Sequence, residues 1–208
     1  MQRSAGVRRL LGTLARNMQS FTLDTNCLVA VDEGRPEAAA IRILSEAHVR
    51  GHAKVAIAAI SASERQRDGQ MLENFFQFTE RVASLNLSHL PLIFPMCYWD
   101  VMFWDACVEP ELGLAELEPK IQGILFPRVP TAWADYCQKY GLDPEAAPLD
   151  KKWKNAKCDV QAFWCHASQK RSVFVTTDKN FHRTTKKPKL LAIAPGRIEY
   201  PDEAALLV

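Results

Sequence analysis

Four acidic side chains lie where the sequence predicts secondary-structure elements to end. Asp24 closes a short strand, Glu64 follows a second apolar strand, and Asp178 comes two residues after a third. Asp159 lies in the helix that precedes this third strand, and it can point to the same place if it sits near the helix start. Parallel α/β sheets bind ligands beyond the carboxyl ends of their strands, so we expect these four carboxylates to converge there.

Converging carboxylates have a specific chemical consequence. Two unit charges about 4 Å apart repel by about 4 kcal/mol at an effective dielectric near 20, so a fold tolerates the group only with a cation or by protonation. Ligands that offer only oxygen favour Mg²⁺ or Mn²⁺ over zinc. One or two such ions can activate water and stabilise a leaving oxygen. The four acids therefore predict metal-dependent hydrolysis of a phosphodiester, for which neither histidine nor lysine is needed as a base.

Each acid also has an ordinary explanation when it is taken alone. Asp24 and Asp178 suit helix N-caps, which Asp commonly forms after a strand. Glu64 suits the first turn of a helix, where the helix dipole favours an acid. The joint placement of the acids at one sheet edge is what favours a metal site.

Alternating strands and helices are predicted on both sides of a less regular central segment. Short apolar runs predict strands at 20–24, 54–60, 172–176 and 190–194. The spacing of apolar residues predicts helices over 36–50, from Ser61 or Ser63 to about 83, over 151–170 and over 201–208. This order implies an α/β fold with a parallel sheet and helices on both of its faces.

Residues 84–150 interrupt that order and are expected to form a largely helical insertion. Helices are predicted near 110–125 and 130–140, whereas the aromatic stretch 97–104 suits either a strand or a helix. The insertion is interpreted as a helical subdomain or as a lid over the site. The chain thus divides into a basic arm at 1–20 and one domain at 21–208.

The composition is that of a soluble globular protein. The 208 residues are 48% apolar and 24% charged, and no apolar run reaches the roughly 18 residues of a membrane-spanning helix. The six cysteines form no C-x-x-C pair, and no secretory signal peptide is recognised. We therefore expect reduced thiols in a cytoplasmic protein, most of them small core residues, and no zinc site.

Residues 1–23 contain four arginines and no acidic residue. This composition overlaps with that of organellar transit peptides, so an organellar targeting signal is one interpretation. An extra N-terminal helix or a frayed tail is the other interpretation, and we favour it.

Basic residues gather in two further stretches, although the formal net charge is only +2. They are candidates for contacts with the phosphates of a polyanion, with solvated surface charge as the alternative. The candidates are Lys151, Lys152, Lys154 and Lys157 in the first stretch, and Lys179, Arg183, Lys186 and Lys187 in the second. Trp153, among the first lysines, suits either base stacking or core burial. His166 lies about 10 Å along the helix from Asp159, and we expect a packed histidine rather than a catalytic base.

At these acids the sequence resembles the PIN-domain nucleases. The similarity consists of Leu-Asp-Thr-Asn at 23–26, Ser-Ala-Ser-Glu at 61–64, the acid at 159 and Phe-Val-Thr-Thr-Asp-Lys-Asn-Phe at 174–181. It covers roughly 21–83 and 151–208. The resemblance implies a three-layer α/β/α fold with a central parallel sheet, and cleavage of RNA that depends on Mg²⁺ or Mn²⁺.

The resemblance also implies roles for individual residues. Asp24, Glu64, Asp159 and Asp178 would be the metal ligands. Thr176 would place its hydroxyl near the metal-bound water, and Asn26 would brace the turn at Asp24.

Many members of this family are toxins of bacterial toxin–antitoxin pairs, which raises the expectation of an inhibitory protein partner. The 95 residues between Glu64 and Asp159, together with the basic arm, depart from the compact toxins. Substrate recognition, masking of an interface and homo-oligomerisation are open as roles for these additions. Two other functions stay open: a PIN-like binding or scaffold module without turnover, and a structure-specific DNA nuclease.

Overall fold

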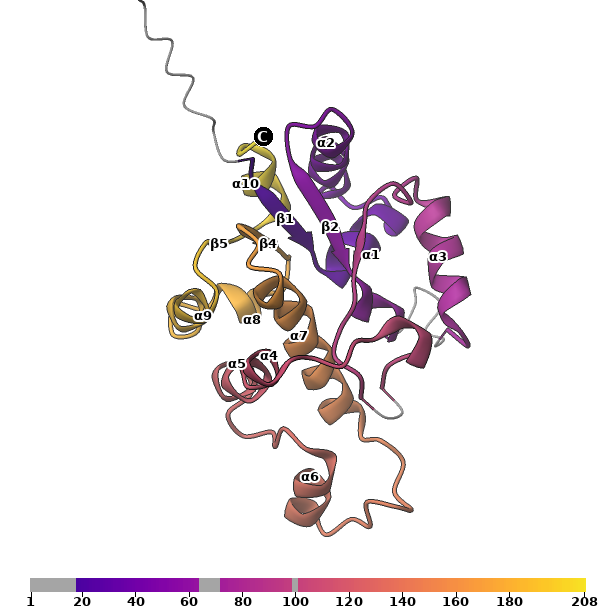
Figure 1. Cartoon of the computed structure of the whole chain (residues 1–208), viewed down its shortest axis with the longest axis vertical. Helices are drawn as coiled ribbons and strands as arrows, with labels where there is room; N and C mark the ends of the chain where they lie inside the picture. Colours follow the sequence, from indigo (N-terminus) through magenta and orange to yellow (C-terminus); the bar gives the residue numbers. More distant parts are fainter. Residues whose placement is uncertain (1–17, 64–71, 99–100) are drawn as a thin grey trace, which may run out of the picture.

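The computed structural model describes residues 18–63, 72–98 and 101–208 of the chain. Within these residues the chain forms a five-stranded, all-parallel sheet with the strand order β3-β2-β1-β4-β5 (Figure 1). The strands are β1 (Ser20–Leu23), β2 (Lys54–Ala58), β3 (Leu92–Ile93), β4 (Val173–Val175) and β5 (Arg197–Glu199). The parallel sheet predicted from the sequence is confirmed.

Helices cover both faces of the sheet, so the fold has three α/β/α layers (Figure 1). One layer holds α1 (Thr25–Glu33), α2 (Ala38–Val49), α3 (Phe75–Ser84) and α10 (Pro201–Ala205), and the other holds α5 (Leu117–Leu125), α7 (Lys151–Ser168) and α9 (Lys187–Ile193). Successive side chains of a strand point to opposite faces. In β1, Phe21 and Leu23 belong to the core under the first layer. Thr22 between them faces α7, where its hydroxyl lies 3.1 Å from Nδ1 of His166.

The strand predicted at 190–194 is wrong, because most of this segment belongs to helix α9. Pro188 in the first turn favours a helix, and of the helical residues in the segment only Leu190 is fully buried. A short apolar run suits a one-sided helix as well as a buried strand. The last strand is β5, and Gly196 before it has a φ of 153°. A side chain at Gly196 would collide with the backbone carbonyl of Ser172.

Helix α1 is absent from the sequence-based predictions. It follows β1 directly, with Asp24 as its N-cap, and it ends at Gly34, whose φ of 65° is left-handed. The helix predicted over 36–50 is confirmed as α2. The terminal helix predicted over 201–208 is confirmed as α10, which is shorter than predicted.

The helix predicted from Ser61 or Ser63 to about residue 83 is described only in part. Residues Ala59–Ser63 form a 3-10 turn, η1, and α3 begins after its N-cap Asn74. Residues 64–71 between these elements lie outside the described part of the chain.

The segment 84–150 is built into the core. It supplies the edge strand β3, and its helix α5 packs along α7 through Ile121 and Leu125. The helices predicted near 110–125 and 130–140 are confirmed as α4 (Leu112–Ala115), α5 and α6 (Trp133–Tyr140). In Figure 1 α6 lies at the end of the molecule farthest from α10.

The stretch 97–104 begins beside a β-bridge between Met96 and Val108 and ends at the 3-10 turn η2 (Trp104–Ala106). The bridge brings the Cα atoms of Cys97 and Cys107 to 4.9 Å, and the two residues form a disulfide. This corrects the expectation that all cysteines are reduced.

The other cysteines, Cys27, Cys137, Cys158 and Cys165, are buried free thiols, as predicted. Among the described residues, no helix is both long and apolar enough to cross a membrane.

Candidate functional site

The site lies at the carboxyl ends of β1 and β4, where the chain order of the sheet changes direction. From β1 the chain continues to β2 and β3 on one side, whereas β4 and β5 extend the sheet on the other side. Such a switch point opens a crevice beyond the strand ends, where ligands of open α/β sheets bind. Asp24 follows β1 and Asp178 follows β4, so both lie at this crevice.

Asp24 is held by hydrogen bonds from three groups. Its Oδ1 accepts from the backbone N–H of Thr25 at 2.8 Å. Its Oδ2 accepts from the hydroxyl of Thr176 at 2.7 Å and from Nδ2 of Asn26 at 3.2 Å. These contacts are consistent with the bracing role expected for Asn26. Asp24 is therefore both a helix cap and a fixed acid at the strand edge.

The Asp24 carboxyl is 4% exposed, and this burial raises its pKa above the ordinary value for Asp. Hydrogen bonds from Thr176, Thr25 and Asn26 act in the opposite direction, and the charge of Asp178 adds to the increase. Burial outweighs the hydrogen bonds, so the ionised carboxylate costs free energy in the folded protein. A cation beside Asp24 would relieve this cost.

Thr176 connects the two acids. Its hydroxyl donates to Asp24 and accepts the backbone N–H of Asp178 at 3.0 Å. Asp178 in turn caps the short helix α8 (Lys179–His182), where its Oδ1 accepts from the N–H of Asn180 at 2.8 Å. One hydroxyl thus links the Asp24 carboxylate to the backbone of Asp178, and both acids act as helix caps.

His182 supports this turn from the other side. Its Nε2 lies 3.0 Å from the carbonyl oxygen of Thr176, and its ring stacks on Tyr200 with centroids 3.7 Å apart. Thr176 is therefore held through both its side-chain hydroxyl and its backbone carbonyl.

Asp159 reaches the site because α7 extends beyond the sheet. The contact of His166 with Thr22 sets that part of α7 level with the middle of β1. Asp159 lies seven residues earlier, about 10 Å nearer the carboxyl edge. It is not in the first turn of α7, which starts at Lys151, so the helix start is not what places it.

Asp159 and Asp178 line the same hollow, which has a volume of about 590 Å³. Its other lining residues come from three elements: Asn26 from α1, Lys151, Asn155 and Cys158 from α7, and Thr177 and Lys179 from the loop and helix after β4. The hollow thus brings two of the predicted acids together, with Asp24 joined to it through Asn26 and Thr176.

Glu64 lies outside the described residues. The segment that leads to it contacts α1, because the hydroxyls of Thr25 and Ser61 share a hydrogen bond at 2.8 Å. Within the part of the chain that the structure describes, no group of three His, Cys, Asp or Glu side chains is close enough to hold a metal. Asp24, Asp159 and Asp178 therefore do not form such a group among the described residues.

His166 is a packed core residue, as predicted. It is fully buried, and burial lowers its pKa to about 3, with the charge of Arg171 as a smaller cause. It is neutral at physiological pH and lies far along α7 from the acids.

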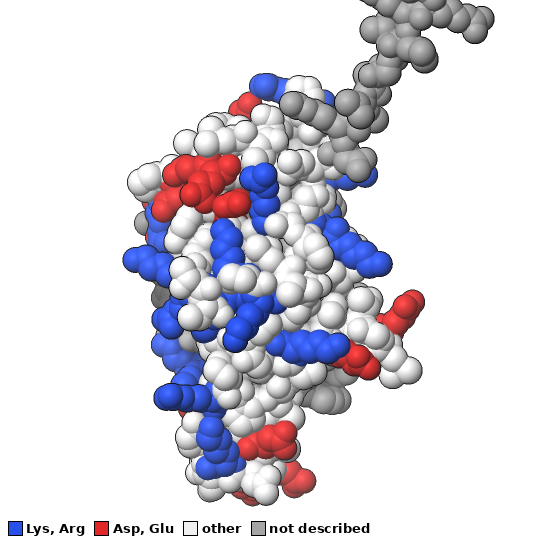
Figure 2. All heavy atoms as spheres, turned by 90° about the vertical axis from the view of Figure 1, so that its left-hand side faces the viewer, with Lys and Arg blue, Asp and Glu red and all other residues white. Residues whose placement is uncertain are grey.

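The basic candidates divide by exposure. Lys151, Lys152, Lys179 and Arg183 are exposed, and Lys154 is partly exposed. Lys186 and Lys187 are partly buried: Lys186 donates to Leu125 and Asn180, and Lys187 lies 3.7 Å from a carboxylate oxygen of Glu199. Figure 2 shows basic side chains along the length of one side of the molecule, with acidic ones in smaller clusters.

Lys157 and Trp153 are not surface contacts for a substrate. Lys157 is 1% exposed, and its ammonium forms an ion pair with Glu118 at 2.7 Å. Trp153 is also 1% exposed, and its Nε1 donates to the carbonyl of Pro130. Both side chains point toward the insertion, which the lysine-rich composition of this stretch does not reveal.

Asn155 is a lining residue that the sequence analysis does not single out. The signal for it is the helical spacing of Lys151, Asn155 and Asp159, which places all three on one face of α7.

Comparisons with protein-family models, with curated proteins and with solved structures found no match for this chain. The functional assignment therefore depends on the site itself.

Proposed function

We propose that this protein is a divalent-metal-dependent nuclease with a PIN-like fold that hydrolyses phosphodiester bonds of RNA. The observation that carries the proposal is the arrangement at the switch point of the sheet. There Asp24 and Asp178 share the hydroxyl of Thr176, and Asp159 lines the same hollow as Asp178. Helix capping alone would explain the presence of Asp24 and Asp178. It does not explain a third acid, Asp159, which lies there because α7 extends beyond the sheet.

The residues present fit a hard divalent cation. Mg²⁺ commonly binds through one or two protein carboxylates and keeps several waters, which suits Asp159 and Asp178 in an open hollow. The raised pKa of the buried Asp24 carboxyl is the second observation, because a nearby cation would stabilise its ionised form. We propose Glu64 as a further ligand from its sequence position after β2.

The residues of the chain would divide the work as follows. Asp159 and Asp178, which line the hollow, would hold the cation, and the nearby Asp24 would add its negative charge. Thr176 and Asn26 would keep the Asp24 carboxylate in place. Bound there, Mg²⁺ or Mn²⁺ supplies an activated water and charge neutralisation at the reacting phosphate. The exposed ammonium groups nearby, such as Lys151 and Lys179, attract the phosphate backbone.

Cleavage of RNA by the purified chain tests the proposal. We expect a labelled single-stranded RNA to be cut in Mg²⁺ or Mn²⁺ and to stay intact in EDTA. Asp178→Asn should lose this cleavage, whereas Asp202→Asn, an exposed acid in α10, should keep it. Wild-type preparations that cut no RNA under any metal condition would refute the proposal. A preference for DNA in competition at matched salt would assign the same site to a DNA nuclease.

Metal binding should also stabilise the protein. A cation that binds only the folded chain raises the free energy of unfolding by about 2.7 kcal/mol at a concentration 100 times its Kd. We expect Mn²⁺ to raise the urea midpoint of the wild-type chain and to have little effect on Asp178→Asn. An equal shift in both proteins would place the bound metal elsewhere.

A further inference from the structure

A second hollow adjoins the hollow at the acids. The second hollow has a volume of about 520 Å³ and shares Lys151, Asn155 and Asp159 with the first. Its far wall is formed by Phe126 and Val129, which come from the insertion. The two hollows therefore adjoin along the face of α7 that carries these three residues, and together they are called the groove.

One face of α7 forms the floor of this groove. Lys152, Asn155, Ala156 and Asp159 all line it and follow the i, i+3, i+4, i+7 spacing of a single helix face. From Lys152 to Asp159 the helix rises about 10 Å.

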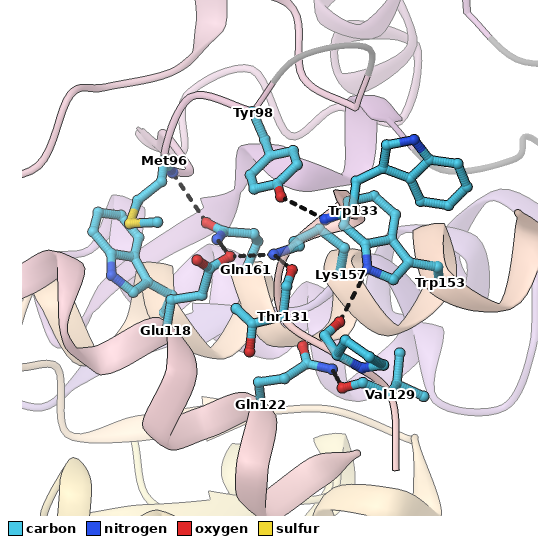
Figure 3. Close-up of polar contacts among 12 residues, drawn as sticks. Met96, Tyr98, Glu118, Gln122, Val129, Thr131, Trp133, Trp153, Lys157 and Gln161 are labelled. Atoms are coloured by element: carbon cyan, nitrogen blue, oxygen red, sulfur yellow. Dashed lines mark hydrogen bonds and ion pairs between the residues drawn. The ribbon is translucent and has the colours of Figure 1, made fainter. Parts of the chain in front are cut away.

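The opposite wall is held in place by side chains. Three consecutive carbonyls after Phe126 each accept a hydrogen bond from a buried side chain, as Figure 3 shows. The bonds run from Nε2 of Gln122 to Val129 at 2.9 Å, from Nε1 of Trp153 to Pro130 at 3.0 Å, and from Nζ of Lys157 to Thr131 at 2.8 Å. A loop bound in this way presents a preformed surface, which lowers the entropic cost of binding a ligand.

The buried ion pair anchors this wall to α7. Glu118 of α5 accepts from Lys157 at 2.7 Å and from Gln161 at 2.8 Å (Figure 3). The ammonium of Lys157 also lies 4.2 Å from the ring centroid of Tyr98. Lys157 is thus a positioning residue: it does not line the groove, but it holds the loop that forms the wall.

Phe126 links the wall to the acids. Its ring is partly exposed, and the ammonium of Lys186 lies 5.6 Å from the ring centroid. Lys186 also donates to the side chain of Asn180, whose backbone N–H binds Asp178. An aromatic ring beside basic side chains is a combination that binds a base and its phosphates.

We propose that this groove binds a single strand of RNA, with one base on Phe126 and phosphates at Lys151 and Lys152, and that it directs the strand to Asp159 and Asp178. The identity of the polymer rests on the proposed function. In a duplex the bases stay stacked on one another, so none offers its face to Phe126. The groove therefore selects single-stranded RNA over duplex RNA.

Direct binding tests the groove without cleavage. Fluorescence anisotropy in EDTA would measure the Kd of the full chain for a labelled ten-nucleotide RNA, alone and annealed to its complement. We expect tighter binding of the single strand and a Kd that rises about fivefold to a hundredfold in Phe126→Ala, with Phe126→Trp close to wild type. Phe76→Ala is the matched control, because this ring is 67% exposed on α3 in the other helical layer.

Salt dependence tests the phosphate contacts. Lys152→Ala should lower the slope of log K against log salt by about 0.7, the value for one contact with a single strand. Lys54→Ala, exposed at the opposite edge of the sheet, should leave the slope unchanged. Urea unfolding of each variant would establish that it is folded.

The outcomes separate this inference from the proposed function. Unchanged binding in a folded Phe126→Ala variant, or equal wild-type affinity for duplex and single strand, would overturn the groove even if the protein cuts RNA. Binding that depends on Phe126 in a protein that never cuts RNA would support the groove and refute the nuclease.

Discussion

Asp24→Asn is expected to abolish RNA cleavage and, in the absence of divalent cations, to stabilise the folded protein at neutral pH. Removing an anion beside the proposed cation is expected to cost several kcal/mol of transition-state stabilisation, and about 4 kcal/mol corresponds to about a thousandfold in rate. The side chain keeps its size, and its remaining oxygen can still cap α1 at the N–H of Thr25. Loss of activity with retained folding is therefore the expected result.

The gain in stability follows from the raised pKa of Asp24. Because the folded chain holds this proton more tightly than the unfolded chain, the free energy of unfolding falls as the pH rises from the unfolded pKa, near 3.8, through the higher folded value. Asparagine does not ionise and escapes this loss. The stability of Asp24→Asn relative to wild type should thus increase across that window and level off above it.

Urea unfolding in EDTA at a series of pH values from about 4 to 8 would measure this difference. Asp202→Asn serves as the control, because it makes the same substitution at an exposed carboxylate. A stability difference between Asp24→Asn and wild type that does not change with pH would show that the buried carboxylate is not the source of the cost. Retained cleavage, with contaminating nuclease excluded by the Asp178→Asn preparation, would remove Asp24 from the site.

The parts of the site that follow from short segments could be predicted from the sequence. Asp24, Thr176 and Asp178 each lie within two or three residues of a strand end, so their placement needs only the parallel sheet. The position of Asp159 needs more, because it depends on how far α7 extends beyond the sheet and on the contact of His166 with Thr22. The position of α7 along the sheet is set by tertiary contacts, and the local spacing of residues does not predict it.

The errors have a related physical origin. The run at 190–194 is too short to distinguish a one-sided helix from a buried strand by periodicity. Its helical form depends on packing against α5 and β5. The disulfide at Cys97 depends on the bridge between Met96 and Val108, a pairing of residues distant in sequence. The sequence around Lys157 predicts a surface charge, because it does not show that α5 places Glu118 beside this lysine.

Lys157→Met is expected to cause the largest loss of stability among the changes considered, about 3–5 kcal/mol. The substitution leaves the carboxylate of Glu118 buried without its cation, and an uncompensated buried charge is costly. Burial lowers the pKa of Lys157, while Glu118 opposes that shift, so the ammonium depends on this one acid. Urea unfolding at pH 7 would measure the loss.

The double variant Lys157→Met with Glu118→Gln separates the contribution of the ion pair to stability from the contribution of side-chain packing. Glutamine keeps an oxygen for the amide of Gln161, and removing both charges from a buried pair is often close to neutral. We expect the double variant to regain most of the stability, which gives a coupling energy of several kcal/mol in the double-mutant cycle. Additive losses would show that the two charges are not coupled.

The same pair of variants separates folding from substrate binding. If Lys157 contacted phosphate directly, the double variant would bind RNA more weakly and lose salt dependence even after its stability was restored. Because the ammonium instead binds Glu118 and the carbonyl of Thr131, we expect an unchanged salt slope in the double variant. Any weaker binding should come with greater mobility of the loop after Phe126, measured as faster amide hydrogen exchange there. A reduced slope would return Lys157 to the set of phosphate contacts and remove it from the support of the groove wall.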